Sequence, residues 1–282
     1  MSEPASTAAQ TNTRIGRRFE ELARRSELGL VAYLTAGDPS LAATEEIVLR
    51  AAEAGADMIE LGIPFSDPVA DGPTIQRASE RALRAGTTLP KVIELVARLR
   101  GKTDIPIVLF GYFNPILQMG LAEFSRRAAK ADADGVLVTD MTPEESGEYC
   151  TAMHANGLDT VFLVAPTSTD ERLRRIAEVS TGFLYVISRT GVTGAKDSLP
   201  EELPASLRRV RKFTALPIAV GFGISVPAQV TVLGGIADAA VVGSSLVAEI
   251  EKASSASDAA EAVAVRVKQL KDAAKHGVSR RG

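Results

Sequence analysis

Residues 57–62 read Asp57-Met58-Ile59-Glu60-Leu61-Gly62, an apolar run with one carboxylate inside it. It belongs to a set of eight short apolar runs along the chain. Several are rich in Val and Ile and most lack strict alternation, which is typical of strands that are covered on both faces. The runs span residues 31–34, 58–61, 107–110, 136–138, 160–164, 183–187, 218–220 and 239–242.

Amphipathic stretches separate these runs and predict helices. They span residues 40–54, 89–99, 121–129, 144–155 and 171–179, and Asp38-Pro39 is expected to open the first of them. The connection from Gly62 to Pro106 has room for two helices. Eight strand-then-helix units predict a (β/α)8 TIM barrel, placed at residues 14–274 as a single domain. An open, doubly wound sheet is the alternative fold.

The two ends of the chain differ from this repeat. Residues 1–13 are small and polar, which predicts a disordered tail. Ile15, Phe19 and Leu22 then recur at helical spacing, so we expect a short N-terminal helix that covers the end or side of the barrel. A terminal helix is predicted over residues 257–274, and residues 275–282 are expected to fray.

Composition excludes several classes of function. The 282 residues carry a formal net charge of −3 with mixed signs, which argues against a nucleic-acid-binding protein. No apolar stretch approaches the roughly 18 residues of a membrane span. With one cysteine and two histidines, a zinc site is not expected. The lone Cys150 suits a reducing setting, which predicts a cytoplasmic protein, and no metal is expected.

Glu60 is the first candidate functional residue. A buried, unpaired carboxylate costs several kcal/mol, roughly, so its place in an apolar strand needs a reason. A structural interpretation pairs it with an arginine or a backbone amide. A functional interpretation makes it a proton-transfer group whose pKa is raised by desolvation. Chemistry in such barrels lies at the C-terminal ends of the strands, which favours the second interpretation.

The loop after this run carries a second acid. It reads Ile63-Pro64-Phe65-Ser66-Asp67-Pro68-Val69-Ala70-Asp71-Gly72-Pro73. Turn chemistry explains Asp67, and Pro73 suits a helix start. Asp71 is less easily explained in this way, because the strand below it already holds Glu60. One buried and one wetter carboxylate could divide the acid and base roles.

Glycine-bearing loops follow the last three predicted strands. They read Ser188-Arg189-Thr190-Gly191-Val192-Thr193-Gly194-Ala195-Lys196, Gly221-Phe222-Gly223-Ile224-Ser225 and Gly243-Ser244-Ser245. Together they predict a phosphate site built from loop N–H groups and a helix N-terminus, with ordinary tight turns as the alternative. The stretch 188–203 is long for such a loop and is expected to act as a lid.

The acidic loop, from Leu61 to Pro73, closely resembles the signature of the tryptophan synthase alpha chain family. The loops at 188–194 and 221–225, and Thr35-Ala36-Gly37-Asp38-Pro39, fall at the places expected for that family. The resemblance covers residues 14–271, nearly all of the chain. It implies a TIM-barrel lyase of tryptophan biosynthesis that cleaves indole-3-glycerol phosphate to indole and glyceraldehyde 3-phosphate by a retro-aldol reaction.

The resemblance also implies roles for individual residues. Glu60 matches the principal acid–base residue, which protonates indole C3 and helps to move the proton of the glycerol hydroxyl. Asp71 matches the second carboxylate, which holds the indole N–H and stabilises the positive charge. Further substrate-binding residues are implied: Tyr185, Phe110 and Phe222 near the indole, and Gly194, Gly223, Gly243 and Ser244 near the phosphate.

The family further implies a partner, a beta chain that holds pyridoxal phosphate and receives the indole, as an alpha2-beta2 tetramer; no cofactor is expected in this chain. Thr139 and Thr142 stand where the family usually has prolines, which leaves the rim of the active face less restrained. Other functions remain open: a different phosphate-sugar aldolase or isomerase on the same barrel, a stand-alone indole-releasing lyase, or a non-catalytic subunit.

Overall fold

The computed structural model describes residues 13–188 and 198–276. Within these ranges, eight parallel strands form a closed barrel in chain order, with β1 paired to both β2 and β8. The predicted barrel is confirmed, and the open sheet is excluded. The strands are β1 Gly29–Thr35, β2 Met58–Gly62, β3 Ile107–Gly111, β4 Gly135–Val138, β5 Asp159–Val164, β6 Leu184–Ile187, β7 Ile218–Gly221 and β8 Ala239–Val242.

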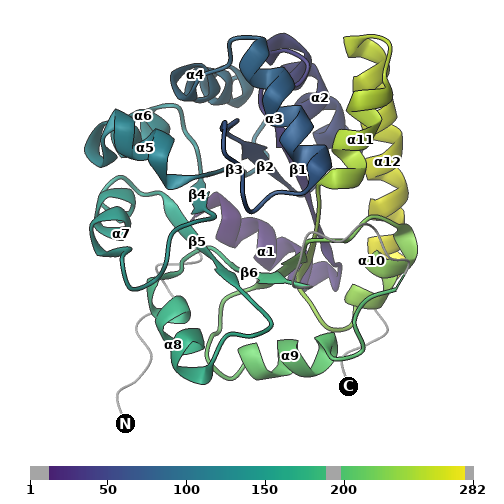
Figure 1. Ribbon diagram of the computed structural model, residues 1–282. Coiled ribbons are helices and arrows are strands. Elements are labelled where there is room, and N and C mark those ends of the chain that lie inside the picture. The colour runs from purple at the N-terminus through teal and green to yellow at the C-terminus, as the bar shows by residue number, and fades with distance from the viewer. Residues whose placement is uncertain (1–12, 189–197, 277–282) are drawn as a thin grey trace.

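Helices surround the barrel on its outside, as Figure 1 shows. The long connection between β2 and β3 holds two of them, as predicted. Among the described residues, no helix combines the length and the apolar character needed to cross a bilayer. The surrounding helices are α2 Leu41–Glu53, α3 Pro73–Arg84, α4 Leu89–Arg100, α5 Phe113–Met119, α6 Leu121–Lys130, α7 Gly147–His154, α8 Asp170–Val179, α9 Leu203–Val210, α10 Pro227–Leu233, α11 Ser244–Lys252 and α12 Ala256–His276.

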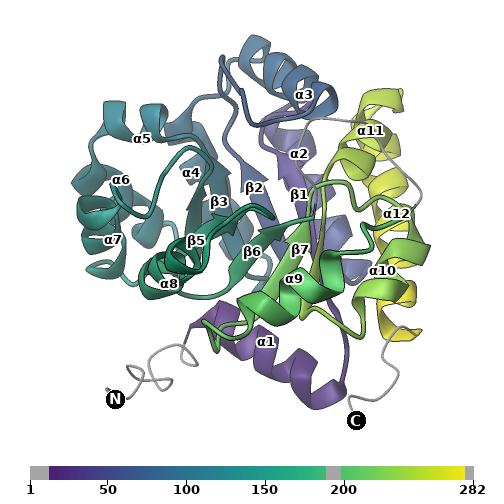
Figure 2. The same ribbon diagram turned by 60° about the horizontal axis from the view of Figure 1, so that its bottom comes forward.

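Helix α1, Arg14–Arg25, lies across the end of the barrel at which the strands begin (Figure 2). Its apolar stripe of Ile15, Phe19 and Leu22 is buried, and the Phe19 ring lies 5.8 Å from that of Phe183 just before β6. The predicted covering helix is therefore confirmed as the floor of the barrel. Thr13, which the sequence placed in the tail, accepts the N–H of Gly16 and caps this helix.

Two helix ends differ from the sequence prediction. Helix α2 is capped by Ser40, whose hydroxyl accepts the N–H of Ala43, so Asp38 and Pro39 precede the helix. Asp38 instead accepts hydrogen bonds from Arg81 on both carboxylate oxygens, at 2.8 Å each. At the other end of the chain, α12 continues to residue 276, two positions into the segment expected to fray.

The strand residues that face the barrel interior form one cluster, separate from the outer layer between strands and helices. In the cross-strand register, Tyr33 of β1 lies beside Glu60 of β2, which lies beside Val108 of β3. The neighbours of Glu60 along its own strand, Ile59 and Leu61, pack into the outer layer. The alternation of a strand therefore turns the Glu60 side chain into the barrel.

Candidate active site

Glu60 is enclosed by the barrel. It is 0% exposed, and neither carboxylate oxygen has a hydrogen-bond partner among the described residues. Burial raises the pKa of Glu60 to about 8, because desolvation disfavours the charged form. An arginine or a backbone amide would have supported a structural role, but neither contacts Glu60 within the described ranges. This side chain is therefore a neutral acid at neutral pH.

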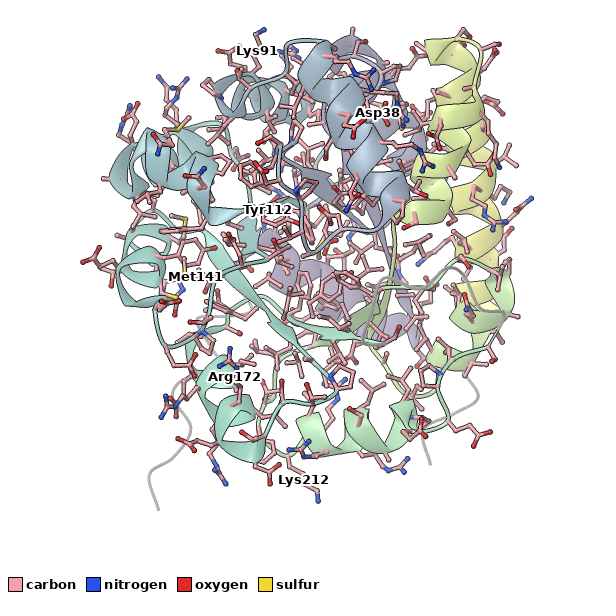
Figure 3. All side chains as sticks on the ribbon, in the orientation of Figure 1. Asp38, Lys91, Tyr112, Met141, Arg172 and Lys212 are labelled. Carbon is pink, nitrogen blue, oxygen red and sulfur yellow. The ribbon has the colours of Figure 1, made fainter. Side chains whose placement is uncertain are left out.

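Asp71 lies in the loop between β2 and α3 and is also buried. The hydroxyl of Tyr112, which follows β3, donates to Asp71 Oδ2 at 3.0 Å and accepts the N–H of Ala70 at 3.0 Å. Figure 3 shows Tyr112 toward the middle of the ring of helices. Burial raises the pKa of Asp71 to about 6, and the Tyr112 hydrogen bond opposes this shift. At neutral pH the two acids thus differ in charge, with Asp71 mostly ionised.

Aromatic side chains lie around the two acids. The rings of Tyr33 and Phe110 meet edge to face at 5.1 Å, and those of Tyr185 and Phe222 at 5.7 Å. Burial is the main cause that raises the pKa values of both tyrosines well above their usual 10.0, and the neighbouring acids Glu60 and Asp71 add to the shift. The structure therefore brings the predicted Tyr185, Phe110 and Phe222 to the same end of the barrel interior as the acids.

The loops after β7 and β8 reach the same end of the barrel. Phe222 and Gly223 have φ angles of 63° and 93°, a left-handed turn in which glycine is favoured. Gly243 is the N-cap of α11, and Ser244 is its first residue. The first N–H groups of a helix lack a partner within the helix, and such a helix start is suited to an anion. Gly194 and the expected lid around Arg189 lie outside the described residues.

Two tyrosines near the acids escaped the sequence prediction. Tyr112 was missed although it directly follows β3, and Tyr33 was missed although it lies beside Glu60 in the register. Ser245, which the sequence had placed in the third glycine-bearing loop, lies at the start of α11 with its hydroxyl buried and without a hydrogen-bond partner among the described residues. Strand ends facing one barrel mouth are the signal that could have found the two tyrosines.

The rim residues that depart from the family pattern are held by local hydrogen bonds. Thr139 donates through both its N–H and its hydroxyl to the carbonyl of Gly111, at 2.9 and 3.1 Å. The hydroxyl of Thr142 donates to Glu145 at 2.9 Å. These hydrogen bonds restrain the loop after β4. They therefore replace part of the restraint that prolines would provide.

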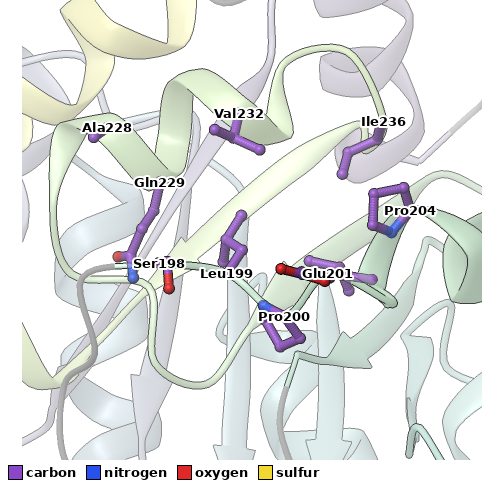
Figure 4. A pocket seen from close by; sticks show the side chains of 10 residues that line it. Ser198, Leu199, Pro200, Glu201, Pro204, Ala228, Gln229, Val232 and Ile236 are labelled. Carbon is purple, nitrogen blue, oxygen red and sulfur yellow. The ribbon is translucent and has the colours of Figure 1, made fainter.

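Two surface hollows lie outside the barrel. One, of about 350 Å³, is lined by α10 and the approach to α9, and Figure 4 shows Leu199, Pro204, Val232 and Ile236 around it. The other, of about 750 Å³, lies between α6 and α7. Neither borders Glu60 or Asp71, so the buried acid pair marks the candidate site.

Comparison with known proteins agrees with this geometry. A sequence model of the family described as tryptophan synthase alpha chain matches residues 19–275. The tryptophan synthase alpha chain of Geotalea daltonii is 50% identical over 239 residues, which cover 85% of this chain and 90% of the relative. That of Geobacter sulfurreducens is 47% identical over 261 residues, which cover 93% and 98%.

Solved structures of this family have the same fold. A chain of Mycobacterium tuberculosis tryptophan synthase superposes with a TM-score of 0.86 at 33% identity, over 93% of this chain and 98% of that one. Tryptophan synthase subunit alpha from Legionella pneumophila gives 0.86 at 35% identity, over the same shares. On the family match and the identity of these relatives, the chain belongs to the tryptophan synthase alpha chain family.

Proposed function

We propose that Glu60 and Asp71 carry out, in this chain, the reaction known for its family. That reaction is the retro-aldol cleavage of indole-3-glycerol phosphate to indole and glyceraldehyde 3-phosphate, a carbon–carbon lyase step of tryptophan biosynthesis. One observation carries the assignment. Two buried acids share the barrel mouth, and their pKa values of about 8 and about 6 leave one neutral and the other mostly ionised at pH 7.

Glu60 acts as the acid and then as the base. Its neutral carboxyl group protonates C3 of the indole ring, which places a positive charge on the ring nitrogen. The resulting carboxylate accepts the proton of the glycerol hydroxyl on the carbon bonded to C3. The bond from C3 to that carbon breaks, its electron pair restores the indole ring, and the hydroxyl-bearing carbon becomes the aldehyde. Glu60 is neutral again, so the protons balance.

Asp71 stabilises the charge that forms during this step. An ionised carboxylate can accept the indole N–H and offset the positive charge that develops when C3 is protonated. Tyr112 holds this carboxylate in place through its 3.0 Å hydrogen bond. An amide at the same place would accept the hydrogen bond but would not offset the charge.

The remaining predicted residues bind the two ends of the substrate. Phe110, Tyr185 and Phe222 offer apolar surface to the indole. Gly223, Gly243 and Ser244 offer backbone N–H groups to the phosphate, and we retain Gly194 in this set on the family motif alone. A Cβ atom at Gly243 would lie 3.3 Å from the Cβ of Tyr33, so the phosphate end lies close to the acids. This spacing suits one small substrate that spans both.

The chain is further proposed to work with a beta chain in an alpha2-beta2 tetramer that takes up the indole. Pyridoxal phosphate would then belong to the beta chain. The step proposed here needs acid–base groups and an anion site, which we assign to residues of this chain. No cofactor is therefore proposed for its own reaction.

The assay for the proposed function measures both products from indole-3-glycerol phosphate with the purified chain, alone and mixed with a beta chain from a close relative. We expect indole and glyceraldehyde 3-phosphate in equal amounts, and a large rise in rate on mixing. A phosphate-sugar aldolase of other specificity would release no indole. A rate that does not respond to the beta chain would indicate a stand-alone lyase.

A further inference from the structure

Tyr33 has a hydroxyl that the fold buries without a strong partner. The residue is 8% exposed, and among the described residues its one hydrogen-bond contact is the hydroxyl of Thr35 at 3.5 Å. A buried hydroxyl that makes only a long contact is costly. Apolar packing needs no hydroxyl, since Phe110 and Phe222 fill comparable positions nearby. Packing therefore does not explain the hydroxyl of Tyr33, and we look for a functional role.

The surroundings of Tyr33 place this hydroxyl at the level of the acids. Tyr33 is in register with Glu60, and a Cβ atom at Gly62, the last residue of β2, would overlap the Tyr33 hydroxyl. The ring is held on one side by Phe110 and on another by Gly243. The phenol thus points across the C-terminal end of β2, the strand that bears Glu60.

The titratable groups around Tyr33 are carboxyl groups and phenols. Among the described residues, the titratable groups that influence it are Asp71, Glu60 and Tyr112, and those that influence the neighbouring Tyr185 are Glu60, Tyr33 and Asp71. Burial raises the pKa of Tyr33 well above 10.0, so its phenol is neutral and able to donate. Glu60 has two buried oxygens without a donor. The Tyr33 hydroxyl is a donor without an acceptor, and the Glu60 oxygens are acceptors without a donor among the described residues. Both groups lie in the barrel interior.

We infer that Tyr33 is a positioning residue of the acid pair, whose hydroxyl donates a hydrogen bond to whichever carboxylate is ionised during turnover. The inference rests on the proposed acid–base roles of Glu60 and Asp71. When Glu60 has given its proton to C3, its carboxylate is buried without a cation, and a phenol donor stabilises it. When Glu60 is neutral, the same hydroxyl is free to serve Asp71.

The test replaces Tyr33 by phenylalanine, which removes the hydroxyl and keeps the ring. Tyr149→Phe is the matched control, because Tyr149 is 1% exposed and its hydroxyl donates to the carbonyl of Val136, away from the acids. Isotope-edited NMR follows the titration of the Glu60 carboxyl, which the loss of its signal in Glu60→Gln identifies. Indole release is measured as a function of pH in parallel.

We expect Tyr33→Phe to raise the titration midpoint of Glu60 by about one pH unit, because the carboxylate loses a donor. We expect kcat to fall about tenfold with KM changed less than about twofold, since the interaction forms with the ionised acid. Tyr149→Phe should lower the unfolding temperature and leave the midpoint unchanged.

An unshifted Glu60 midpoint in folded Tyr33→Phe, with unchanged kcat, would overturn the inference. The NMR midpoint does not depend on turnover, so it separates this result from a failure of the proposed function. A wild-type chain that releases no indole contradicts the proposed function, whatever the midpoint of the variant.

Discussion

Two acids at strand β2, Asp57 and Glu60, have opposite surroundings. Asp57, directly before the strand, accepts a hydrogen bond from Lys271 Nζ at 2.7 Å and another from the N–H of Leu30 at 2.8 Å. Glu60, farther along the same strand, has neither kind of partner among the described residues. Both acids are buried. The difference therefore lies in what the fold places around each carboxylate, and not in how deeply it is buried.

Two other acids at the floor of the barrel also have cationic partners. At the floor, Asp134 binds Arg14, Arg100 and the N–H of Ile107, and Asp238 binds Arg211 and the N–H of Ile218. Each of these carboxylates joins the strand that follows it to a neighbouring strand and to at least one arginine. At the mouth, Glu60 and Asp71 have no basic partner among the described residues. Acids without a cation can change charge during a reaction, whereas Asp134 and Asp238 each have an arginine partner.

The largest expected effect comes from Glu60→Gln. We expect turnover to fall by about 10² to 10⁴, the usual contribution of a placed general acid. Binding of glycerol phosphate, measured by calorimetry, should persist because the anion site is untouched. The unfolding temperature at pH 7 should stay equal or rise, since the amide removes an acid that must be neutral in the folded state. Turnover close to that of the wild type would remove Glu60 from the mechanism.

Asp71→Asn should have the next largest effect. We expect turnover to fall by about 10² to 10³, because an uncharged amide cannot offset the positive charge on the indole. The measurement is indole release at saturating substrate. The matched control is Asp67→Asn, in the same loop, because Asp67 is exposed and bonded to its neighbour Ser66. Equal losses in the two variants would indicate a general effect on the loop and would contradict the role of Asp71.

Asp57→Asn should lower the stability of the chain and leave its activity unchanged. The change leaves the buried ammonium of Lys271 with Glu27, at 3.3 Å, as its remaining carboxylate. We expect a loss of about 3 kcal/mol in the free energy of unfolding, as for other broken buried pairs. Indole release per folded molecule should stay unchanged. Urea unfolding measures the first quantity, and a stable but inactive variant would break the distinction between floor and mouth.

Tyr112→Phe should have a smaller effect. The lost hydrogen bond opposes the burial of Asp71, so the pKa of Asp71 should rise above about 6. We expect about a tenfold loss of activity below neutral pH, the rate equivalent of a hydrogen bond to a charged group. Activity should recover as the pH rises and Asp71 ionises. A loss that is the same at every pH would show that Tyr112 acts in another way.

The smallest expected effect is the pH dependence of the wild-type chain near neutral pH, and it needs no substitution. The reaction requires ionised Asp71, so activity should be lost as the pH falls through about 6. It also requires neutral Glu60, so activity should be lost as the pH rises through about 8. Between these limits the rate of the wild type should change little. A rate that keeps rising well above pH 8 would contradict a neutral Glu60.

The sequence allowed the barrel, its covering helix and both mouth acids to be predicted, because these depend on local patterns and on a specific loop motif. It did not reveal that Glu60 lacks a partner while Asp57 has one. The Asp57 and Lys271 pair joins positions far apart in the chain, and only the docking of α12 brings them together. Tyr33 and Tyr112 escaped notice for a related reason. Which aromatic residues face the acids depends on the register of neighbouring strands.

The central claim is that Glu60 is a neutral acid before the substrate arrives. Infrared spectroscopy of the ligand-free chain tests it most directly, by comparison of the wild type with Glu60→Gln across pH. The account predicts a protonated-carboxyl band at pH 7 that is absent from the variant and disappears with a midpoint of about 8. A wild-type spectrum at pH 7 without that band, and with an ionised Glu60 in its place, would contradict the account.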